Sequence, residues 1–370
     1  MQNKKIKVLL VSPYKGTVGG ISRWTGHILR YYNSLSTSNN IELEQFYGKD
    51  IIVFDNSSIL KRIINGFRRY IPFIRSLKQK IKSESYDVVH FASSASYSLI
   101  RDILAIKISK KNGVKTIIHF RFGRIPEIYR KSNWEWELLK RVINKSDKTI
   151  VIDKSSYNTL INSGFINIEL LSNPLTPEIN NIINSNINIK REKRLILFTG
   201  HVVENKGVFE LIEACKNIPD VKVRLVGHVK DEVKYKLHNL AGENNSWLEI
   251  IGEKSYESTI KEMLTCELFV LPTYTEGFPN VILESMACGC PIIASAVGAI
   301  PEMLNIDSDE PCGLCIESKN IPELRSSILI LLDNKKLTSE YGNRAKKRVN
   351  KEYSMSIVWE KMVEIWESVL

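Results

Sequence analysis

The chain has 370 residues, of which 43% are hydrophobic and 25% charged. These values are typical of a folded globular protein and exclude a disordered or fibrous one. The length is too great for one compact core and fits two domains of ordinary size. No uncharged apolar run reaches the ~18 residues of a transmembrane helix, and Ile6–Val11 is too short for a signal peptide. We therefore expect a cytoplasmic protein.

The formal charge of +11 is unevenly distributed along the chain. Residues 1–190 hold 30 Lys and Arg against 14 Asp and Glu, a balance of +16, and the remainder holds 22 against 27, a balance of −5. A basic half and a mildly acidic half indicate different partners for the two.

The six cysteines agree with a reducing compartment, because their spacing is not that of a small secreted scaffold. Cys288-x-Cys290 and Cys312-x-x-Cys315 could form a four-thiolate zinc site. Buried free thiols are the commoner explanation, and we expect no metal site.

Short β-rich runs alternate with segments of helical spacing, the pattern of parallel α/β domains. In the first half, strands are predicted at Lys7–Ser12, Asp87–Ala92, Lys115–Phe120 and Lys148–Ile152, and helices at Ile21–Leu35, Tyr97–Asn112 and Trp134–Asn144. In the second half, strands are predicted at Leu195–Thr199, Val221–Val226, Leu248–Ile251, Leu268–Leu271 and Pro291–Ala294, and helices at Gly207–Lys216, Asp231–Gly242, Ser255–Cys266, Pro279–Cys288 and Ile300–Leu304.

The Asn- and Ile-rich stretch Pro174–Lys190 has two prolines and no clear period, which indicates a linker. It would separate two doubly wound domains that face a cleft, with ligands beyond the carboxyl ends of the strands. The tail Met355–Leu370 is predicted to be a helix that packs across a domain surface. Its apolar face comprises Ile357, Val358, Met362, Ile365 and Trp366.

The segment Leu271–Glu284 carries the strongest chemical signal. A hydrophobic strand ends at Leu271, a Gly/Pro loop follows, and a helix begins near Pro279. A helix start favours phosphate or sugar oxygens because its N–H groups and dipole point outward. Glu276 and Glu284 could line the same pocket as acceptors for hydroxyl groups, although two glutamates alone would favour a solvated surface.

This segment resembles the E-x7-E motif of glycosyltransferase family 4, a group of retaining enzymes with the GT-B fold. The resemblance continues through Ser285–Glu302 and extends back to Phe198–Gly207 and Leu225–Gly227. It implies two Rossmann-like domains facing a cleft. Residues 1–175 with 355–370 would bind the acceptor, and the C-terminal helix would return to this domain. Residues 190–354 would bind the nucleotide sugar.

The resemblance also implies residue roles in binding the donor. Glu284 would bind the ribose hydroxyls, Glu276 the hydroxyls of the donor sugar, and Lys206 the diphosphate, where charge grows as the leaving group departs. The loop around Lys254 would touch the base. Backbone and turn contacts would come from Gly200, Gly227, Gly277, Phe278, Pro279, Asn280 and Val281.

One position departs from the family pattern. Where relatives usually have arginine after Gly200, this chain has His201. Arginine offers a permanent forked phosphate contact, whereas histidine is charged only part of the time near neutral pH. Either His201 binds the diphosphate weakly or another cation substitutes, with Arg121 and Arg124 as candidates.

The N-terminal half carries two further matches. Gly19-Gly20, within Gly16–Ser22, follows the first strand and would lie against the donor diphosphate and the acceptor. His119 ends a predicted strand at the position where similar enzymes place a histidine beside the transferred sugar. A histidine at a strand end can equally be structural.

The resemblance implies a retaining, metal-independent transfer that needs no cofactor besides the nucleotide sugar. In such enzymes the departing phosphate is thought to deprotonate the incoming hydroxyl. That would explain why the sequence shows no acid/base pair of the glycosidase kind.

The basic segment Leu60–Lys82 mixes cations with Ile, Phe and Tyr, a composition that suits an anionic membrane surface. Nucleic-acid binding is the rival interpretation, but no nucleic-acid module accompanies the segment, and a solvated basic surface is also open. We expect two short helices here, broken at Pro72, and peripheral association with the inner face of the plasma membrane.

We therefore predict a glycosyltransferase that moves a sugar from a UDP- or GDP-linked donor to a hydroxyl of a lipid-linked saccharide. The pathway would be bacterial surface polysaccharide assembly, as for lipopolysaccharide. Two alternatives stay open: a non-catalytic subunit that binds nucleotide sugars, and a soluble GT-B enzyme such as a nucleotide-sugar epimerase.

Overall fold

The structure is a computed structural model that describes residues 5–13, 19–35, 40–47 and 59–370, with side chains for all of these except residues 59–69. The contacts divide the chain into two compact units. The N-terminal unit comprises Met1–Ser172 with Val358–Leu370, and the C-terminal unit comprises Asn173–Ile357. In the described residues, no helix is both long and apolar enough to cross a membrane.

The N-terminal unit is built on a six-stranded parallel sheet of order β2-β1-β3-β4-β5-β6. Its strands are β1 (Ile6–Val11), β2 (Ile41–Phe46), β3 (Val88–Ser93), β4 (Lys115–Phe120), β5 (Lys148–Val151) and β6 (Ile168–Leu170). Its helices are α1 (Gly20–Ser34), α2 (Ile59–Ser83), α3 (Ser98–Lys111), α4 (Ile125–Lys131), α5 (Trp134–Lys145), α6 (Lys154–Asn162) and most of α15 (Met355–Glu367).

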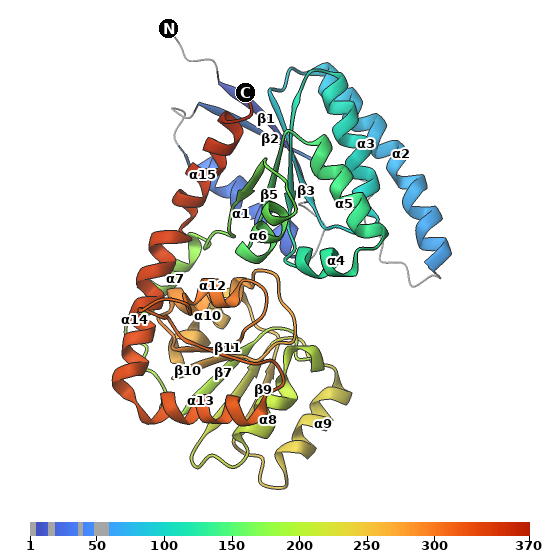
Figure 1. The fold of residues 1–370 in the computed structure, drawn as a ribbon. Helices are drawn as coiled ribbons and strands as arrows, with labels where there is room; N and C mark the ends of the chain where they lie inside the picture. The colour runs from blue at the N-terminus through green and yellow to red at the C-terminus, as the bar shows by residue number, and fades with distance from the viewer. Residues whose placement is uncertain (1–4, 14–18, 36–39, 48–58) are drawn as a thin grey trace. The chain divides into compact units, whose positions relative to one another are not determined.

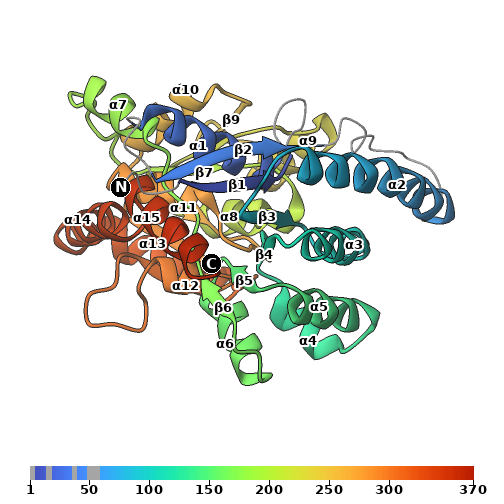
Figure 2. The same cartoon turned by 90° about the horizontal axis from the view of Figure 1, so that it is seen from above.

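Helices cover both faces of this sheet. Helices α2, α3 and α5 lie side by side over one face, while α1 and α15 cover the other (Figures 1 and 2). Every residue of β3 is buried, as expected for a central strand of a parallel sheet that is covered on both sides.

Helix α2 runs unbroken through Pro72, so the predicted break into two short helices is wrong. Three side chains one turn apart, Phe73, Leu77 and Ile81, are buried in the core below it. Proline in a helix interior costs about 3 kcal/mol. Burying three large apolar side chains, at about 1.5–3 kcal/mol each, outweighs that cost.

The C-terminal unit is built on a second parallel sheet of order β12-β11-β10-β7-β8-β9. Its strands are β7 (Leu195–Thr199), β8 (Lys222–Val226), β9 (Leu248–Gly252), β10 (Leu268–Leu271), β11 (Ile292–Ser295) and β12 (Leu314–Ile316). Its helices are α7 (Glu178–Ser185), the 3-10 turn η1 (Glu204–Lys206), α8 (Val208–Cys215), α9 (Asp231–Ala241), α10 (Tyr256–Thr265), α11 (Asn280–Ala287), α12 (Ile300–Met303), α13 (Ile321–Asp333) and α14 (Lys335–Glu352).

Two segments near the ends of the C-terminal unit bear on the sequence predictions. The stretch 174–190, expected to be a linker, contains α7, whose Ile179 is fully buried and which packs on α10. The predicted tail helix is confirmed as α15. Its residues Val358, Met362 and Trp366 are buried in the chain, and those from Val358 onward belong to the N-terminal unit.

Candidate functional site

In the C-terminal unit, the loop between β10 and α11 contains Glu276. Leu271 at the end of β10 is buried, and α11 begins at Asn280 with Pro279 as its N-cap. The N-terminal end of α11 therefore follows this loop directly. Backbone N–H groups and the positive end of the helix dipole at such a place favour anionic or hydroxyl oxygens.

The backbone of Gly298 lies close against this loop. Its φ is +57°, and a Cβ there would lie 2.2 Å from the carbonyl oxygen of Glu276 and 2.7 Å from that of Gly277. The N–H of Ala299 donates to the Gly277 carbonyl at 2.9 Å. The turn after β11 can approach the loop this closely because it has no side chain at Gly298.

A second strand-end loop, η1 after β7, lies beside the first. The N–H of Tyr274 donates to the Asn205 carbonyl at 2.9 Å. Gly207, with φ +71°, comes so close that a Cβ would lie 2.0 Å from the carbonyl oxygen of Pro272. These contacts bring Lys206 to Glu276, and the two side chains form an ion pair. Their side chains are 25% and 17% exposed, so the pair faces solvent in part.

The ends of β7 and β8 form a third part of this edge. The N–H of Gly200 donates to the Val226 carbonyl at 3.0 Å, and a Cβ on Gly227 would lie 1.9 Å from the Gly200 carbonyl oxygen. His201 follows as an exposed residue whose ring meets the edge of the His228 ring at 6.3 Å.

Two other residues predicted to bind the nucleotide sugar, Glu284 and Lys254, lie outside these three loops. Glu284 lies on α11 and is 8% exposed. The ammonium of Lys254 forms an ion pair with Glu262, which also binds Arg224.

Asn173 binds the β10–α11 loop. The sequence did not predict this role of Asn173. Its side-chain N–H groups donate to the Phe278 carbonyl at 3.3 Å and to Asn280 Oδ1 at 3.0 Å. The Phe278 ring packs against the edge of Tyr353 at 5.8 Å. Phe278 is thus fixed at both its backbone and its side chain.

In the N-terminal unit, Gly19 caps α1 with φ +154°, and Gly20 is the first residue of that helix. Among the residues that the structure describes, none would have a heavy atom within 4 Å of a Cβ at either position. The predicted loop residues Gly16, Thr17 and Val18 lie outside the described residues.

His119, the penultimate residue of β4, belongs to a chain of ring contacts in which His90, His119 and Trp366 are fully buried. Trp366 Nε1 donates to His90 Nδ1 at 3.0 Å, and His90 Nε2 lies 3.2 Å from His119 Nδ1. His119 Nε2 lies 3.0 Å from Arg121 Nη1, and the Arg121 guanidinium lies over the Trp24 ring at 4.3 Å. The edge of Trp24 also meets His119 at 5.3 Å.

Burial keeps both imidazoles neutral. It lowers the pKa of His90 to about 3 and the pKa of His119 well below its usual value, with the Arg121 charge adding to both. Burial also lowers the pKa of Arg121 to about 9. Arg124, the other predicted substitute cation, forms an ion pair with Glu135 at 2.6 Å.

All six cysteines are free thiols. Cys266 Sγ lies 3.9 Å from Cys290 Sγ, and both are buried. Among the residues described here, no cluster of three or more His, Cys, Asp or Glu could hold a metal ion.

Family models cover most of the chain. A model described as glycosyl transferases group 1 matches residues 180–348, and one described as Glycosyltransferase Family 4 matches residues 36–178. The chain belongs to glycosyltransferase family 4. It is accordingly a glycosyltransferase, as the E-x7-E motif predicted.

Two curated relatives match this glycosyltransferase along most of its length. It is 28% identical over 363 residues to an uncharacterized glycosyltransferase of Methanocaldococcus jannaschii, covering 97% of this chain and 96% of the relative. It is 25% identical over 335 residues to the capsular polysaccharide biosynthesis glycosyltransferase CapM of Staphylococcus aureus, covering 87% of this chain and 83% of CapM.

Solved structures confirm the predicted GT-B fold. The structure of Anabaena HepE in complex with UDP superposes with a TM-score of 0.72 at 16% sequence identity, covering 98% of this chain and 100% of HepE. Identity this low shows the fold alone.

Within this glycosyltransferase, the structure brings Lys206 and Glu276 together beside the start of α11. It also adds three residues that sequence reasoning missed: Asn173, His90 and Trp366. For His90, the sequence did offer a signal, because a polar residue stands there within an otherwise apolar strand. Its partner lies 276 positions away, which no local pattern reveals.

Proposed function

We propose that this glycosyltransferase moves a sugar from a UDP- or GDP-linked donor to a hydroxyl acceptor, with retention at the anomeric carbon and without a metal ion. The observation that carries the proposal is the Lys206–Glu276 ion pair beside the N-terminal end of α11. A cation, a carboxylate and a helix start together suit a diphosphate linked to a polyhydroxylated sugar.

Each group has a distinct role in this proposal. Lys206 neutralises charge on the departing diphosphate, which stabilises the transition state. Glu276 accepts hydrogen bonds from hydroxyls of the donor sugar, helped by the backbone of Gly277–Val281. Glu284, on the buried side of α11, accepts hydrogen bonds from the ribose hydroxyls.

His201 takes the place of the arginine usual in this family. Its exposed ring at the end of β7 can donate a hydrogen bond to a phosphate oxygen. It cannot make the forked contact of a guanidinium. We therefore expect a weaker hold on the diphosphate than an arginine would give at this position.

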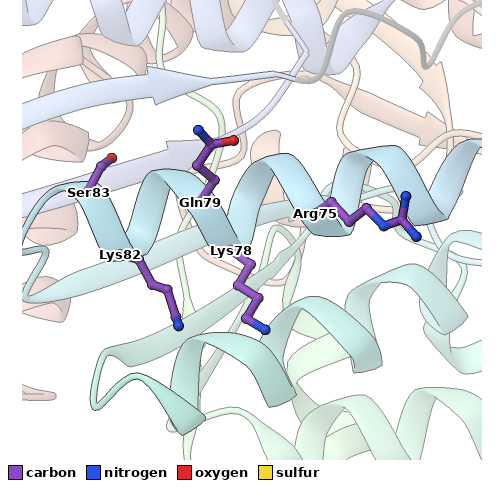
Figure 3. A pocket seen from close by; sticks show the side chains of 5 residues that line it. All are labelled: Arg75, Lys78, Gln79, Lys82 and Ser83. Atoms are coloured by element: carbon purple, nitrogen blue, oxygen red, sulfur yellow. The ribbon is translucent and has the colours of Figure 1, made fainter.

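The acceptor would be a lipid-linked saccharide in bacterial surface polysaccharide synthesis. The relative CapM is named for capsular polysaccharide biosynthesis. Helix α2 supports a membrane-bound acceptor, because Arg75, Lys78 and Lys82 line a surface hollow with Gln79 and Ser83 (Figure 3). Each cation near an anionic leaflet adds about 1 kcal/mol of attraction.

A thermal-shift screen with UDP, GDP, ADP and their sugar conjugates tests the donor site. A ligand that binds only the folded protein stabilises it by about 2.7 kcal/mol at a hundredfold excess over Kd. We expect a shift with one nucleotide that Glu284→Ala abolishes. Glu276→Gln should keep most of the nucleotide affinity but lose turnover.

The alternatives give different results in the same assays. Binding of a nucleotide sugar without transfer to any acceptor would indicate a non-catalytic subunit. Conversion of the donor without an acceptor would indicate an epimerase. No shift with any nucleotide would overturn the assignment of the donor site.

Flotation with liposomes containing phosphatidylserine tests the membrane surface. Lys78→Glu combined with Lys82→Glu should release the protein from the vesicles. The matched control combines Lys346→Glu with Lys347→Glu, two exposed cations on α14. Equal loss in both double variants would mean that net charge, rather than α2, governs binding.

A further inference from the structure

The row of contacts Trp366–His90–His119–Arg121 has more N–H hydrogens than hydrogen bonds that could accept them. Its three contacts, of 3.0, 3.2 and 3.0 Å, join four groups in a row. The indole N–H of Trp366 and the guanidinium of Arg121 are donors only, while a neutral imidazole has one donor and one acceptor. Four hydrogens therefore meet three contacts, and one contact must bring two N–H groups together.

Assigning protons from the Trp366 end gives one solution. Trp366 donates to His90 Nδ1, so the proton of neutral His90 lies on Nε2 and is donated to His119 Nδ1. The proton of neutral His119 then lies on Nε2, beside Arg121. In this arrangement the two donors meet at the outer end of the chain.

Assigning protons from the Arg121 end gives the opposite solution. Arg121 would donate to His119 Nε2, which places the two donors at the contact of His90 with Trp366 or, if Trp366 still donates to His90, at the contact of His90 with His119. Trp366, His90 and His119 are all 0% exposed, so no solvent acceptor can relieve a mismatch at either of these contacts. Two buried donors without an acceptor are costly. Arg121 is only partly buried by surface area and can turn aside, so the outer end tolerates the mismatch.

We propose that Trp366 and His90 are positioning residues that hold His119 as its Nε2–H tautomer, and that His119 and Arg121 together present two N–H donors to one ligand oxygen. The two nitrogens are 3.0 Å apart, a separation that one oxygen between them can bridge once Arg121 turns slightly. The strong burial of His119, which keeps its ring neutral, agrees with a fixed donor.

This inference deepens the proposed function, on which its choice of ligand rests. His119 is the penultimate residue of β4 and lies near the carboxyl edge of the sheet, where ligands of such domains bind. A donor at Nε2 cannot accept a proton, so His119 would bind an oxygen and would not act as a general base. The oxygen belongs either to a phosphate or to a sugar hydroxyl, and both are acceptors.

Nuclear magnetic resonance of the full chain with 15N-labelled histidine tests the tautomer without any donor or turnover. We expect the His119 Nε2 signal to be that of a protonated nitrogen and the Nδ1 signal that of an acceptor. Trp366→Phe removes the indole N–H and keeps an aromatic ring, and it should add the Nδ1–H form of His119. A wild-type His119 protonated on Nδ1 would overturn the proposal.

Trp359→Phe is the matched control. Trp359 lies on the same helix, and its ring meets that of Trp366 at 5.6 Å. The Trp359→Phe substitution should leave the His119 tautomer unchanged. If both variants altered the tautomer equally, packing of α15 would be the cause, and the proposed positioning of His119 by Trp366 and His90 would be wrong. This readout is independent of activity, so it separates failure of the proposed positioning of His119 from failure of the proposed function.

Inorganic phosphate and glucose, added separately to the labelled protein, distinguish the two sources of oxygen. A downfield shift of the His119 Nε2 proton with phosphate would assign the site to a phosphate oxygen, and a shift with glucose to a hydroxyl. The shift should be lost in Arg121→Gln. A proton that moves with neither probe would overturn the shared-oxygen part of the proposal.

Discussion

Lys206 and Glu276 form an ion pair across 70 positions of sequence, and three loops at strand ends make that contact possible. The N–H of Tyr274 binds the Asn205 carbonyl, and Gly207 lies against Pro272. Glu276 in turn lies on Gly298. The backbone of the C-terminal unit thus positions a cation and a carboxylate together before any ligand arrives.

Lys206→Met should lower kcat by about 10²–10³-fold, the usual effect of removing one group that stabilises transition-state charge. Stability should change little, because a partly exposed ion pair contributes about 0–1 kcal/mol. Steady-state kinetics and chemical denaturation measure the two effects. Lys216→Met is the control, since Lys216 also pairs with a glutamate, Glu213. Comparable kinetic losses in both would contradict the role of Lys206.

Gly298→Ala should destabilise the protein and weaken nucleotide binding. The left-handed backbone at φ +57° costs a non-glycine residue about 1–2 kcal/mol, and the new Cβ would also collide with the Glu276 carbonyl. Gly113→Ala separates the two effects, because Gly113 has φ +77° and a Cβ there would have no atom of the described residues within 4 Å. Urea denaturation should show the larger loss for Gly298→Ala, and calorimetry with the nucleotide that the thermal-shift screen identifies should show weaker binding only there. Equal losses would mean that the collision relaxes without cost.

The sequence predicted most of the second sheet, because its strands are continuous apolar runs bounded by turns. Leu195–Thr199 and Leu268–Leu271 have the predicted bounds. Strand β2 (Ile41–Phe46) was missed, although it alternates apolar and polar residues, because it is an edge strand with only one side well buried. Strands β6 and β12 have three residues each, too few for a pattern.

The candidate site was predicted only in part. Glu276, Glu284 and Lys206 could be found because they stand within continuous motifs. The tie between Asn173 and Phe278 spans 105 positions, and that between His90 and Trp366 spans 276. Such contacts depend on the tertiary packing of remote elements, for which one sequence carries no periodic signal.

Asn173→Ala should weaken nucleotide binding, although Asn173 itself is not among the residues proposed to contact the donor. The substitution leaves the Phe278 carbonyl and Asn280 without the amide that binds them, and losing a buried hydrogen-bond partner costs about 1–3 kcal/mol. The β10–α11 loop should loosen, which raises severalfold the Kd for the nucleotide that the thermal-shift screen identifies. Asn186→Ala is the control, because the Asn186 amide binds only the nearby Ile182 carbonyl among the contacts described here. Unchanged affinity for that nucleotide in Asn173→Ala would show that the loop holds its shape without Asn173.

The buried histidines should make folding stability depend on pH. The pKa of His90 is about 3 in the folded chain and about 6.5 when unfolded. Between these values the unfolded chain binds a proton that the folded chain does not. Stability therefore falls as the pH drops from about 6.5 towards 3, by up to about 1.4 kcal/mol per pH unit for each such histidine.

Urea midpoints measured at several pH values below 7 provide the test. His90→Gln removes one titrating group and keeps an oxygen that can accept from Trp366, so its stability should fall less steeply with acid than that of the wild type. His238→Gln, on the surface helix α9, is the matched control, because it replaces a histidine outside the buried chain of rings. If His90→Gln kept the full slope, His90 would be protonated in the folded protein, and the neutral chain of rings would be wrong.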